Sequence, residues 1–338
     1  MTRALLIGAG MVAGMHVDAI RTSDRVALAG IVARRPEQAE ALGTNAPVHR
    51  TLGRALKAGG VDFAVLTTPP DTRRAFIKPL SEAGIPILCE KPIERDYRRA
   101  ARLVDLCDAA GVAFGAVLQH RMRPAAQDLI ARVRNGDLGD IGALEVRIPW
   151  WREQSYYAAP GRGTYARDGG GVLITQAIHT LDLMLALAGP VTRVQAITAT
   201  TPLHDLEAED MAAAALAFEN GAVGSLMATT ACYPGAAEEI TLMGTRGSAT
   251  LSAAHLTLRP MGGPEEVIGA ASGSGGGADP MAFTSDWHRA VIEDFADAIT
   301  MRRAPAIPAR DALAAQALID AIRRSARGRQ AITPEDRR

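Results

Sequence analysis

The sequence predicts an α/β protein with two domains: an N-terminal, doubly wound parallel sheet and a C-terminal α+β domain with a large, mostly antiparallel open sheet. Short apolar runs alternate with helix-like stretches up to about residue 118, which is typical of parallel sheets with right-handed crossovers. A glycine turn, Gly8–Ala13, follows the first run. After residue 190, short runs follow one another through tight turns, which indicates antiparallel pairing.

The first domain, residues 1–120, contains apolar runs of the length expected for strands buried on both faces. These runs are Ala4–Gly8, Val26–Ala33, Phe63–Thr67, Ile85–Cys89 and Ala113–Leu118. The helix-like stretches between them include Pro36–Leu42, Thr72–Ala83 and Asp96–Ala110.

The second domain, residues 121–338, begins with a predicted helix over Pro124–Asn135 and continues with a second over Leu173–Ala188, which Gly189-Pro190 ends. Its predicted strands are Ala143–Trp150, Val191–Thr200, Met211–Phe218, Ala222–Thr230, Ile240–Met243, Ser248–Leu251 and Leu256–Leu258. The small-residue run Gly269–Ala278 predicts a mobile surface loop. Two helices, Asp286–Thr300 and Arg310–Arg327, close the chain and could pack back on the first domain.

Composition excludes several classes of protein. The 37 Lys and Arg balance 37 Asp and Glu, so no excess of positive charge indicates a nucleic-acid partner. No run of about 20 apolar residues indicates a membrane span, and the apolar run after Met1 is too short and glycine-broken for a good secretory signal. The three cysteines lack CxxC spacing, so we expect no disulfide framework, no metal site and a cytoplasmic location.

The turn Gly8-Ala9-Gly10-Met11-Val12-Ala13 lies between a predicted strand and a predicted helix, where a dinucleotide fingerprint belongs. Glycine allows the tight turn and the close approach of a pyrophosphate, which the helix N-terminus attracts. A glycine turn of purely structural role is the alternative.

The end of the second predicted strand bears on the choice of coenzyme. An acidic residue there would bind the ribose hydroxyls of NAD, but Ala33 is followed by Arg34 and Arg35. Guanidinium groups pair well with phosphate, so the sequence favours NADP over NAD. The alternative is that both arginines lie in a solvated loop.

Two further motifs carry titratable side chains. Glu90-Lys91-Pro92 ends a predicted strand, where a lysine can hydrogen-bond a substrate oxygen as hydride leaves; a solvated lysine is the alternative. Downstream of Gly169–Gly171, helical spacing places Thr175, His179 and Asp182 on one stripe. A histidine there could act as general base, or it could be a hydrogen-bonded core residue.

Together these motifs and Gly244–Ser248 resemble the Gfo/Idh/MocA oxidoreductase family, from Arg3 to about Arg327. The resemblance implies a Rossmann domain and a C-terminal sheet domain that forms homodimers or homotetramers. It also implies NAD(P)-dependent oxidation or reduction of a secondary hydroxyl or ketone on a sugar, a sugar nucleotide or a cyclitol.

By this resemblance Lys91 is the catalytic lysine and His179 the catalytic histidine. The implied coenzyme contacts are Gly8, Gly10, Met11, Val12, Arg34, Thr68, Pro69, Glu90, Lys91, Gln119, Trp151, Arg152 and His288, of which the last three come from the second domain. The implied substrate contacts are Lys91, Tyr157, Arg162, Thr175 and His179.

The sequence departs from the family where an aspartate is expected one helical turn before His179, because Thr175 stands there. With Ser155-Tyr156-Tyr157 and Gly161–Thr164, this resembles members that act on nucleotide-activated amino-sugar uronates. A free sugar, a glycoside or an inositol is equally compatible. A non-catalytic coenzyme sensor and an oligomeric scaffold are the alternatives to an enzyme.

Overall fold

The computed structural model describes residues 1–269 and 284–335, and the chain divides into two compact units. Unit 1 comprises Met1–Gln119 and Thr284–Leu313; unit 2 comprises His120–Phe283 and Ala314–Arg338. The segment 284–313 therefore belongs with the N-terminal unit, although the predicted second domain extended unbroken to residue 338. It is held there because α8 (Asp286–Met301) packs on α1 (Ala13–Arg21) and the Ala116 N–H donates to the Ile307 carbonyl.

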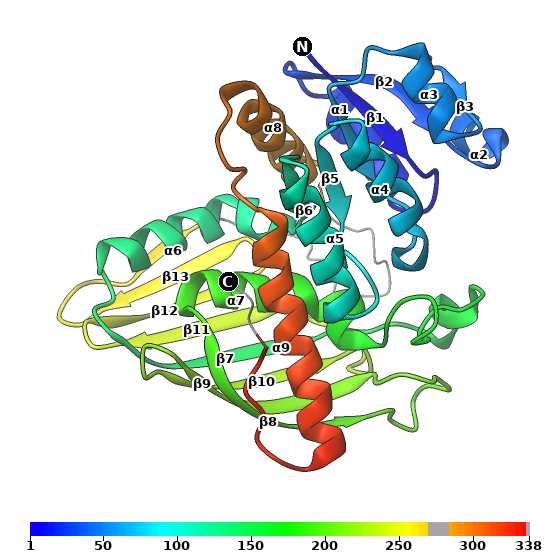
Figure 1. Ribbon diagram of the computed structural model, residues 1–338. Helices are drawn as coiled ribbons and strands as arrows, with labels where there is room; N and C mark the ends of the chain where they lie inside the picture. The colour runs from blue at the N-terminus through cyan, green and yellow to red at the C-terminus, as the bar shows by residue number, and fades with distance from the viewer. Residues whose placement is uncertain (270–283, 336–338) are drawn as a thin grey trace. The chain divides into compact units, whose positions relative to one another are not determined.

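Unit 1 contains a six-stranded parallel sheet, which confirms the predicted doubly wound architecture (Figure 1). The strand order is β3-β2-β1-β4-β5-β6, so the direction of winding reverses between β1 and β4. The strands are β1 (Thr2–Ile7), β2 (Val26–Val32), β3 (Val48–His49), β4 (Phe63–Leu66), β5 (Ile87–Glu90) and β6 (Phe114–Val117). The sequence analysis missed β3, because two residues are too short to show a pattern.

The helices of unit 1 connect these strands. Besides α1 and α8 they are α2 (Pro36–Glu40), α3 (Leu52–Ala58), α4 (Arg74–Glu82) and α5 (Tyr97–Ala109), with the 3₁₀ turn Pro70–Thr72 before α4. Asp96 caps α5 by accepting a hydrogen bond from the Arg99 N–H, as expected for an N-cap aspartate. The predicted helices over residues 36–42, 72–83 and 96–110 are thus confirmed within two residues at each end.

Unit 2 contains an eight-stranded sheet of order β14-β13-β12-β11-β7-β10-β9-β8. Its pairs are antiparallel except for β7 with β10, which is parallel. The strands are β7 (Ile141–Pro149), β8 (Val191–Ala199), β9 (Met211–Phe218), β10 (Val223–Thr229), β11 (Glu239–Gly244), β12 (Gly247–Ser252), β13 (His255–Pro260) and β14 (Glu266–Ile268). The mostly antiparallel sheet is confirmed. Strand β14 was not predicted, and of the predicted loop over residues 269–278 only Gly269 is described.

Two complete helices of unit 2, α6 (Pro124–Asn135) and α7 (Ile178–Ala188), lie over one face of this sheet, as does α9 (Ala309–Gly328) from Ala314 onward (Figure 1). The residues of β9 alternate accordingly: Ala212, Ala214, Leu216 and Phe218 are buried, whereas Ala213 and Ala215 are exposed. One face of the sheet thus carries the core of unit 2. Among the described residues no helix combines the length and apolar character needed to cross a bilayer.

Candidate functional site

The glycine turn lies at the reversal of strand order in unit 1, where β1 and β4 adjoin. The Gly8 N–H donates to the Val32 carbonyl, and the Thr67 N–H and hydroxyl both donate to the Ile7 carbonyl, at 2.9 and 3.1 Å. Gly8 has φ +111°, and a Cβ atom there would lie 2.8 Å from Thr67 Oγ1. Gly8 is therefore required for the packing of the turn itself. Open α/β sheets bind their ligands at such a reversal, outside the carboxyl ends of the strands.

The residues of this edge fit a dinucleotide. A Cβ atom on Gly10 would meet no atom within 4 Å, so its backbone is open to a ligand. Thr68 Oγ1 and Gln119 Oε1 are buried and have no hydrogen-bond partner among the described residues. Both residues are predicted coenzyme contacts, and buried polar atoms normally find partners. The turn leads directly into the N-terminus of α1, the end of a helix that attracts an anion.

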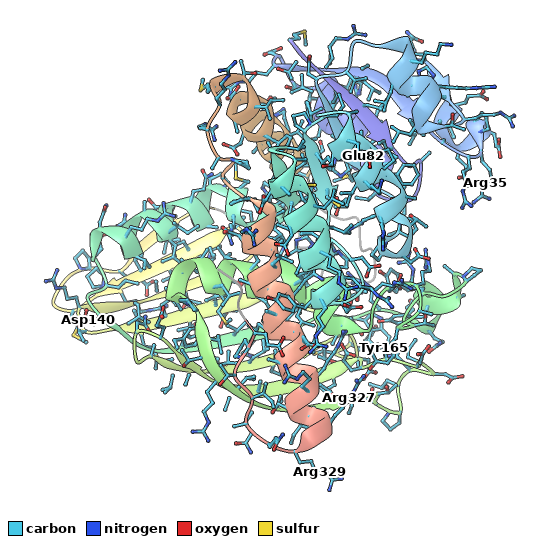
Figure 2. All side chains as sticks on the ribbon, in the orientation of Figure 1. Arg35, Glu82, Asp140, Tyr165, Arg327 and Arg329 are labelled. Carbon is cyan, nitrogen blue, oxygen red and sulfur yellow. The ribbon has the colours of Figure 1, made fainter. Side chains whose placement is uncertain are left out.

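The residues after β2 present positive charge. Ala33 is buried, whereas Arg34 and Arg35 are exposed and the Arg35 side chain projects outward from the start of α2 (Figure 2). The described residues place no carboxylate in an ion pair with either arginine. The position that an NAD-specific acid would occupy is therefore apolar and followed by two solvated cations.

Lys91 follows β5 and is half-buried in unit 1. Glu90 Oε2 accepts a hydrogen bond from the Lys91 backbone N–H at 3.1 Å, and Glu90 Oε1 accepts one from His16 Nε2 at 2.8 Å. His288 Nε2 lies 3.8 Å from the same Oε1, and the rings of His16 and His288 form a T-shaped pair with centroids 5.1 Å apart. Glu90 therefore anchors the backbone at Lys91 to α1 and α8.

This buried cluster holds Glu90 charged and His288 neutral. Burial by itself would raise the pKa of Glu90, but the hydrogen bond from His16, together with the electrostatic effects of His16, His288 and Lys91, outweighs it and lowers that pKa to about 2. Burial lowers the pKa of His288 to about 3, with the charges of His16 and Lys91 acting in the same direction. His288 was expected to come from the second domain; it lies instead in unit 1, because α8 packs on α1.

His16, Glu90 and His288 offer ligand atoms within 4.8 Å of one another, which is also the composition of a zinc site. The 2.8 Å distance between His16 Nε2 and Glu90 Oε1 is that of a hydrogen bond. All three side chains are at most 7% exposed, and Lys91 adds a neighbouring positive charge. The cluster therefore fits a hydrogen-bonded anchor better than a cation site.

His179 lies in unit 2, on the first turn of α7, and is buried. Its ring stacks on His120, with centroids 4.9 Å apart and an angle of 25° between the planes. His120 Nε2 lies 2.6 Å from Arg123 Nη2, and the Arg123 guanidinium is ion-paired with Glu238. Because an arginine can only donate, His120 Nε2 must accept, which fixes the tautomer of the ring beside His179.

The segment before His179 was predicted to be α-helical, but Leu173–Ala177 form a π-helix and regular α-helical spacing begins only at Ile178. The predicted placement of Thr175 on one helical stripe with His179 and Asp182 is therefore wrong, because it assumed α-helical spacing throughout. The Thr175 hydroxyl donates to the Gly171 carbonyl at 2.7 Å and contacts Gln176 Oε1. π-Bulges are frequent at functional sites.

The glycine run before this helix serves packing within unit 2. A Cβ atom on Gly171 would lie 1.7 Å from the Glu209 carbonyl oxygen, and one on Gly170 would lie 1.8 Å from Arg323 Nη2. Arg323 donates to the Gly169 carbonyl at 2.7 Å and to Glu209 Oε1 at 3.0 Å. The groups that approach the glycines so closely are thus parts of the chain itself.

Asp182 forms an ion pair with Arg121. Arg121 Nε and Nη2 donate to its two carboxylate oxygens at 2.6 and 2.5 Å, and Asp182 is fully buried. Such a bidentate pair satisfies both oxygens. Asp182 therefore does not replace the family aspartate missing at position 175.

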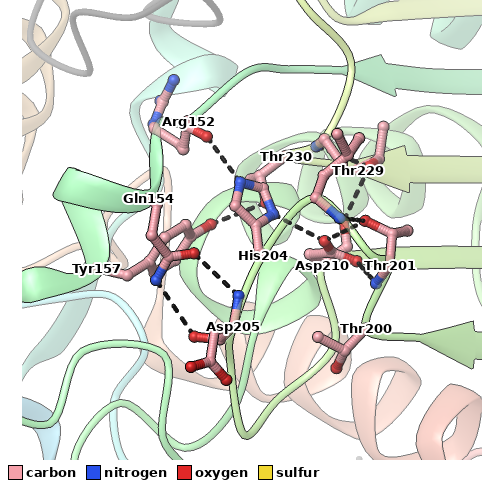
Figure 3. A network of polar contacts seen from close by, with 12 residues as sticks. Arg152, Gln154, Tyr157, Thr200, Thr201, His204, Asp205, Asp210, Thr229 and Thr230 are labelled. Atoms are coloured by element: carbon pink, nitrogen blue, oxygen red, sulfur yellow. Dashed lines mark hydrogen bonds and ion pairs between the residues drawn. The ribbon is translucent and has the colours of Figure 1, made fainter.

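The loop after β7 is tied to the sheet through a polar network (Figure 3). His204 bridges Asp210 Oδ2, at 2.7 Å, and the Arg152 carbonyl, at 2.8 Å. Tyr157 OH lies 2.8 Å from Thr230 Oγ1, and burial raises the pKa of Tyr157 to about 12. Tyr157 thus stays protonated at neutral pH.

Cationic and aromatic side chains alternate along this loop. The Arg152 guanidinium lies 5.4 Å from the Trp150 ring centroid and 5.6 Å from that of Tyr156, and the Arg162 guanidinium lies 4.4 Å from the Tyr156 ring. Trp151 packs against His204 at 5.9 Å. Farther along, the Tyr165 ring meets Arg327 of α9 at 5.6 Å (Figure 2). The loop therefore gathers positive charge beside flat rings.

Within unit 1 the structure gathers residues from four places at one edge of the sheet: the glycine turn, Thr68 and Pro69 after β4, Glu90 and Lys91 at the end of β5, and Gln119 beyond β6. Within unit 2 it groups His179 with His120, and Tyr156, Tyr157, Arg152 and Arg162 along one loop. A meeting of Lys91 with His179 stays a prediction. Sequence analysis missed Arg73, His204 and His16; only His16 had a signal, since it shares a buried helical stripe with Ala13, Val17 and Ile20.

Two family descriptions match most of the chain. A family description of an oxidoreductase with an NAD-binding Rossmann fold matches residues 2–117, and that of the GFO/IDH/MocA C-terminal domain matches residues 126–250. The chain belongs to the Gfo/Idh/MocA oxidoreductase family. The expected family is thereby confirmed.

Three relatives illustrate the range of this family. The WlbA dehydrogenase from Bordetella pertussis, solved in complex with NADH and UDP-GlcNAcA, is 30% identical in sequence to this chain. The two structures have a TM-score of 0.85, and the match covers 98% of each chain. A D-apiose dehydrogenase from Paraburkholderia graminis is 27% identical over 65% of this chain and 58% of its own length. An inositol 2-dehydrogenase from Rhizobium meliloti is 25% identical over 95% of each chain. The chain thus spans little more than half the length of the first of these curated relatives.

The neutral, buried state of His288 predicts a pH-dependent stability. The unfolded chain takes up a proton near the ordinary pKa of 6.5, whereas folded His288 does so only near 3. Its contribution to stability is therefore present above pH 6.5 and is lost as the pH falls towards 3. We expect wild-type protein to lose about 2 kcal/mol more than His288→Asn between pH 7 and pH 5. Urea unfolding measures this difference, and equal losses in the two proteins would contradict it.

Proposed function

We propose that this protein is an NAD(P)-dependent dehydrogenase or reductase that acts on a secondary hydroxyl or ketone of a sugar-type substrate. The observation that carries the proposal is Lys91, whose backbone is anchored by buried Glu90 at the same sheet edge as the glycine turn. A sensor that only binds coenzyme would not need a lysine whose backbone is held at that edge. Family membership, and the names of the sugar and cyclitol dehydrogenases among its relatives, agree with this activity.

In the proposed reaction Lys91 Nζ donates a hydrogen bond to the substrate oxygen and His179 accepts the hydroxyl proton. The coenzyme, when bound at the glycine turn, supplies the hydride acceptor for oxidation or the donor for reduction. Stacking on His120 orients the His179 ring, and the lysine stabilises negative charge on the oxygen. Position 175 carries a threonine, whose hydroxyl donates to the Gly171 carbonyl. In the proposed reaction the proton therefore leaves His179 without help from a carboxylate at position 175.

As substrate we propose a nucleotide-activated amino-sugar uronate. Such a molecule carries a pyrophosphate and a carboxylate, and arginines with stacked rings suit both groups and the base. Arg162 and Arg152 beside Tyr156 supply this chemistry, with Tyr157 as a neutral hydrogen-bonding group. The likeness to WlbA, which is solved with UDP-GlcNAcA, points the same way.

We expect Lys91→Met and His179→Asn each to reduce kcat at least about 100-fold, because each removes a group that acts on the reacting oxygen. The Kd for NADH or NADPH should change far less. The assay follows NADH or NADPH absorbance with UDP-linked amino-sugar uronates, free sugars and inositols. Lys57→Met, on the exposed face of α3, is the control and should keep the wild-type rate. Coenzyme binding without turnover of any substrate would indicate a sensor instead.

For the coenzyme we propose a preference for NADP, supported by buried Ala33 and by the solvated charges of Arg34 and Arg35. NADPH should bind more tightly than NADH, and Arg34→Ser should weaken NADPH binding about tenfold, the scale of one hydrogen bond to a charged group. NADH binding should change little. Fluorescence titration with both coenzymes, with exposed Arg54→Ser as control, measures this. Tighter binding of NADH by wild-type protein would overturn the proposal.

We also propose that the protein is a homo-oligomer through the outer face of the unit 2 sheet. Ile197 on β8, Val223 on β10 and Met243 on β11 are 74%, 56% and 44% exposed there, beside the small side chains of Ala213 and Ala215. A second copy would cover these exposed apolar side chains. Light scattering should give a dimer or tetramer, and Ile197→Asp should shift it towards the monomer; a monomeric wild type would refute this.

A further inference from the structure

Arg73 precedes α4 and is a buried arginine, with 2% of its surface exposed. Its guanidinium makes hydrogen bonds to three backbone carbonyls and also interacts with the buried Cys89 thiol. Arg73 Nε donates to the Thr68 carbonyl at 2.9 Å, and Arg73 Nη1 donates to the carbonyls of Glu90 and Pro92. One buried cation therefore joins the loop after β4 to the loop after β5.

The carbonyls that Arg73 binds lie on either side of Lys91. Glu90 precedes Lys91 and Pro92 follows it, and Glu90 Oε2 accepts the Lys91 N–H from the other direction. The backbone at Lys91 is thus fixed at three consecutive residues by two buried charges. The third carbonyl belongs to Thr68, whose buried hydroxyl lies at the predicted coenzyme edge.

We propose that Arg73 is a positioning residue, which sets the place of Lys91 relative to the coenzyme-binding loop at Thr68. The proposal rests on the function proposed above, because it assumes that Lys91 acts on the substrate oxygen. Hydride transfer depends steeply on geometry, so a displacement of about 1 Å can cost about 100-fold in rate. Arg73 itself touches neither reacting group; it acts through the backbone that carries Lys91.

The planar fork of arginine is needed for this task. A lysine presents a single point of attachment and cannot reach the carbonyls of both loops in the same fixed arrangement. An apolar side chain would remove the donor that the buried carbonyls of Glu90 and Pro92 share with the partly buried carbonyl of Thr68. Arg73→Lys should therefore be intermediate between wild-type protein and Arg73→Met.

The kinetic test combines Arg73→Met with Lys91→Met. Alone, Arg73→Met should lower kcat about 100-fold with a much smaller change in KM. In the Lys91→Met background it should lower kcat less than about threefold, because residues that act as a unit are not additive. Leu80→Ala, at a fully buried position on α4, is the stability control. It should lower Tm and keep kcat. Additive effects of the two substitutions would overturn the proposal.

A second measurement does not depend on the substrate. The sequence contains three lysines, Lys57, Lys78 and Lys91, so reductive methylation with ¹³C yields few methyl signals, and Lys91→Arg assigns that of Lys91. Arg73→Met should move the Lys91 signal towards those of exposed Lys57 and Lys78, whereas Leu80→Ala should leave it in place. An unmoved signal in Arg73→Met would refute the positioning role. If the Lys91 signal moves in Arg73→Met but wild-type protein is inactive on every substrate, only the proposed function is refuted.

Discussion

The reversal of strand order between β1 and β4 is the constraint on which the coenzyme site depends. Chains that leave two neighbouring strands in opposite directions open a crevice at the carboxyl edge of the sheet. The turn at Gly8 and the loop at Thr67 face each other there and are bonded through the Ile7 carbonyl. Every further element of the unit 1 site, from Thr68 to Lys91, is placed by its position along this edge.

Unit 1 buries several charged and polar side chains beside that crevice. A guanidinium, a carboxylate and two imidazoles surround the residues on either side of Lys91. Desolvating ions is costly unless hydrogen bonds satisfy them. Here the Arg73 charge is shared among three carbonyl dipoles, and Glu90 accepts from both His16 and Lys91. These hydrogen bonds offset the cost of desolvation, and they also fix the backbone at the end of β5.

In unit 2, close packing fixes the backbone that leads to His179. Gly170 and Gly171 allow Arg323 and Glu209 to reach the backbone before the π-helix, and the π-helix leads directly into His179. The His179 ring lies against His120, which Arg123 and Glu238 hold. A histidine whose neighbours are this constrained has few orientations, which suits a proton acceptor.

The sequence by itself determined both sheets, most of their strands and the glycine turn, because apolar period and turn residues are local signals that survive folding. It also singled out Lys91, through a motif at the end of a predicted strand, and His179, through its place on a predicted helix that follows a glycine run. Only the tertiary structure revealed Arg73, whose burial follows from carbonyls that lie up to 19 residues away, and the π-helix, which no α-helical spacing can show. It also decided that His288 belongs to unit 1. These features depend on contacts between distant segments, and such contacts leave no periodic trace along the chain.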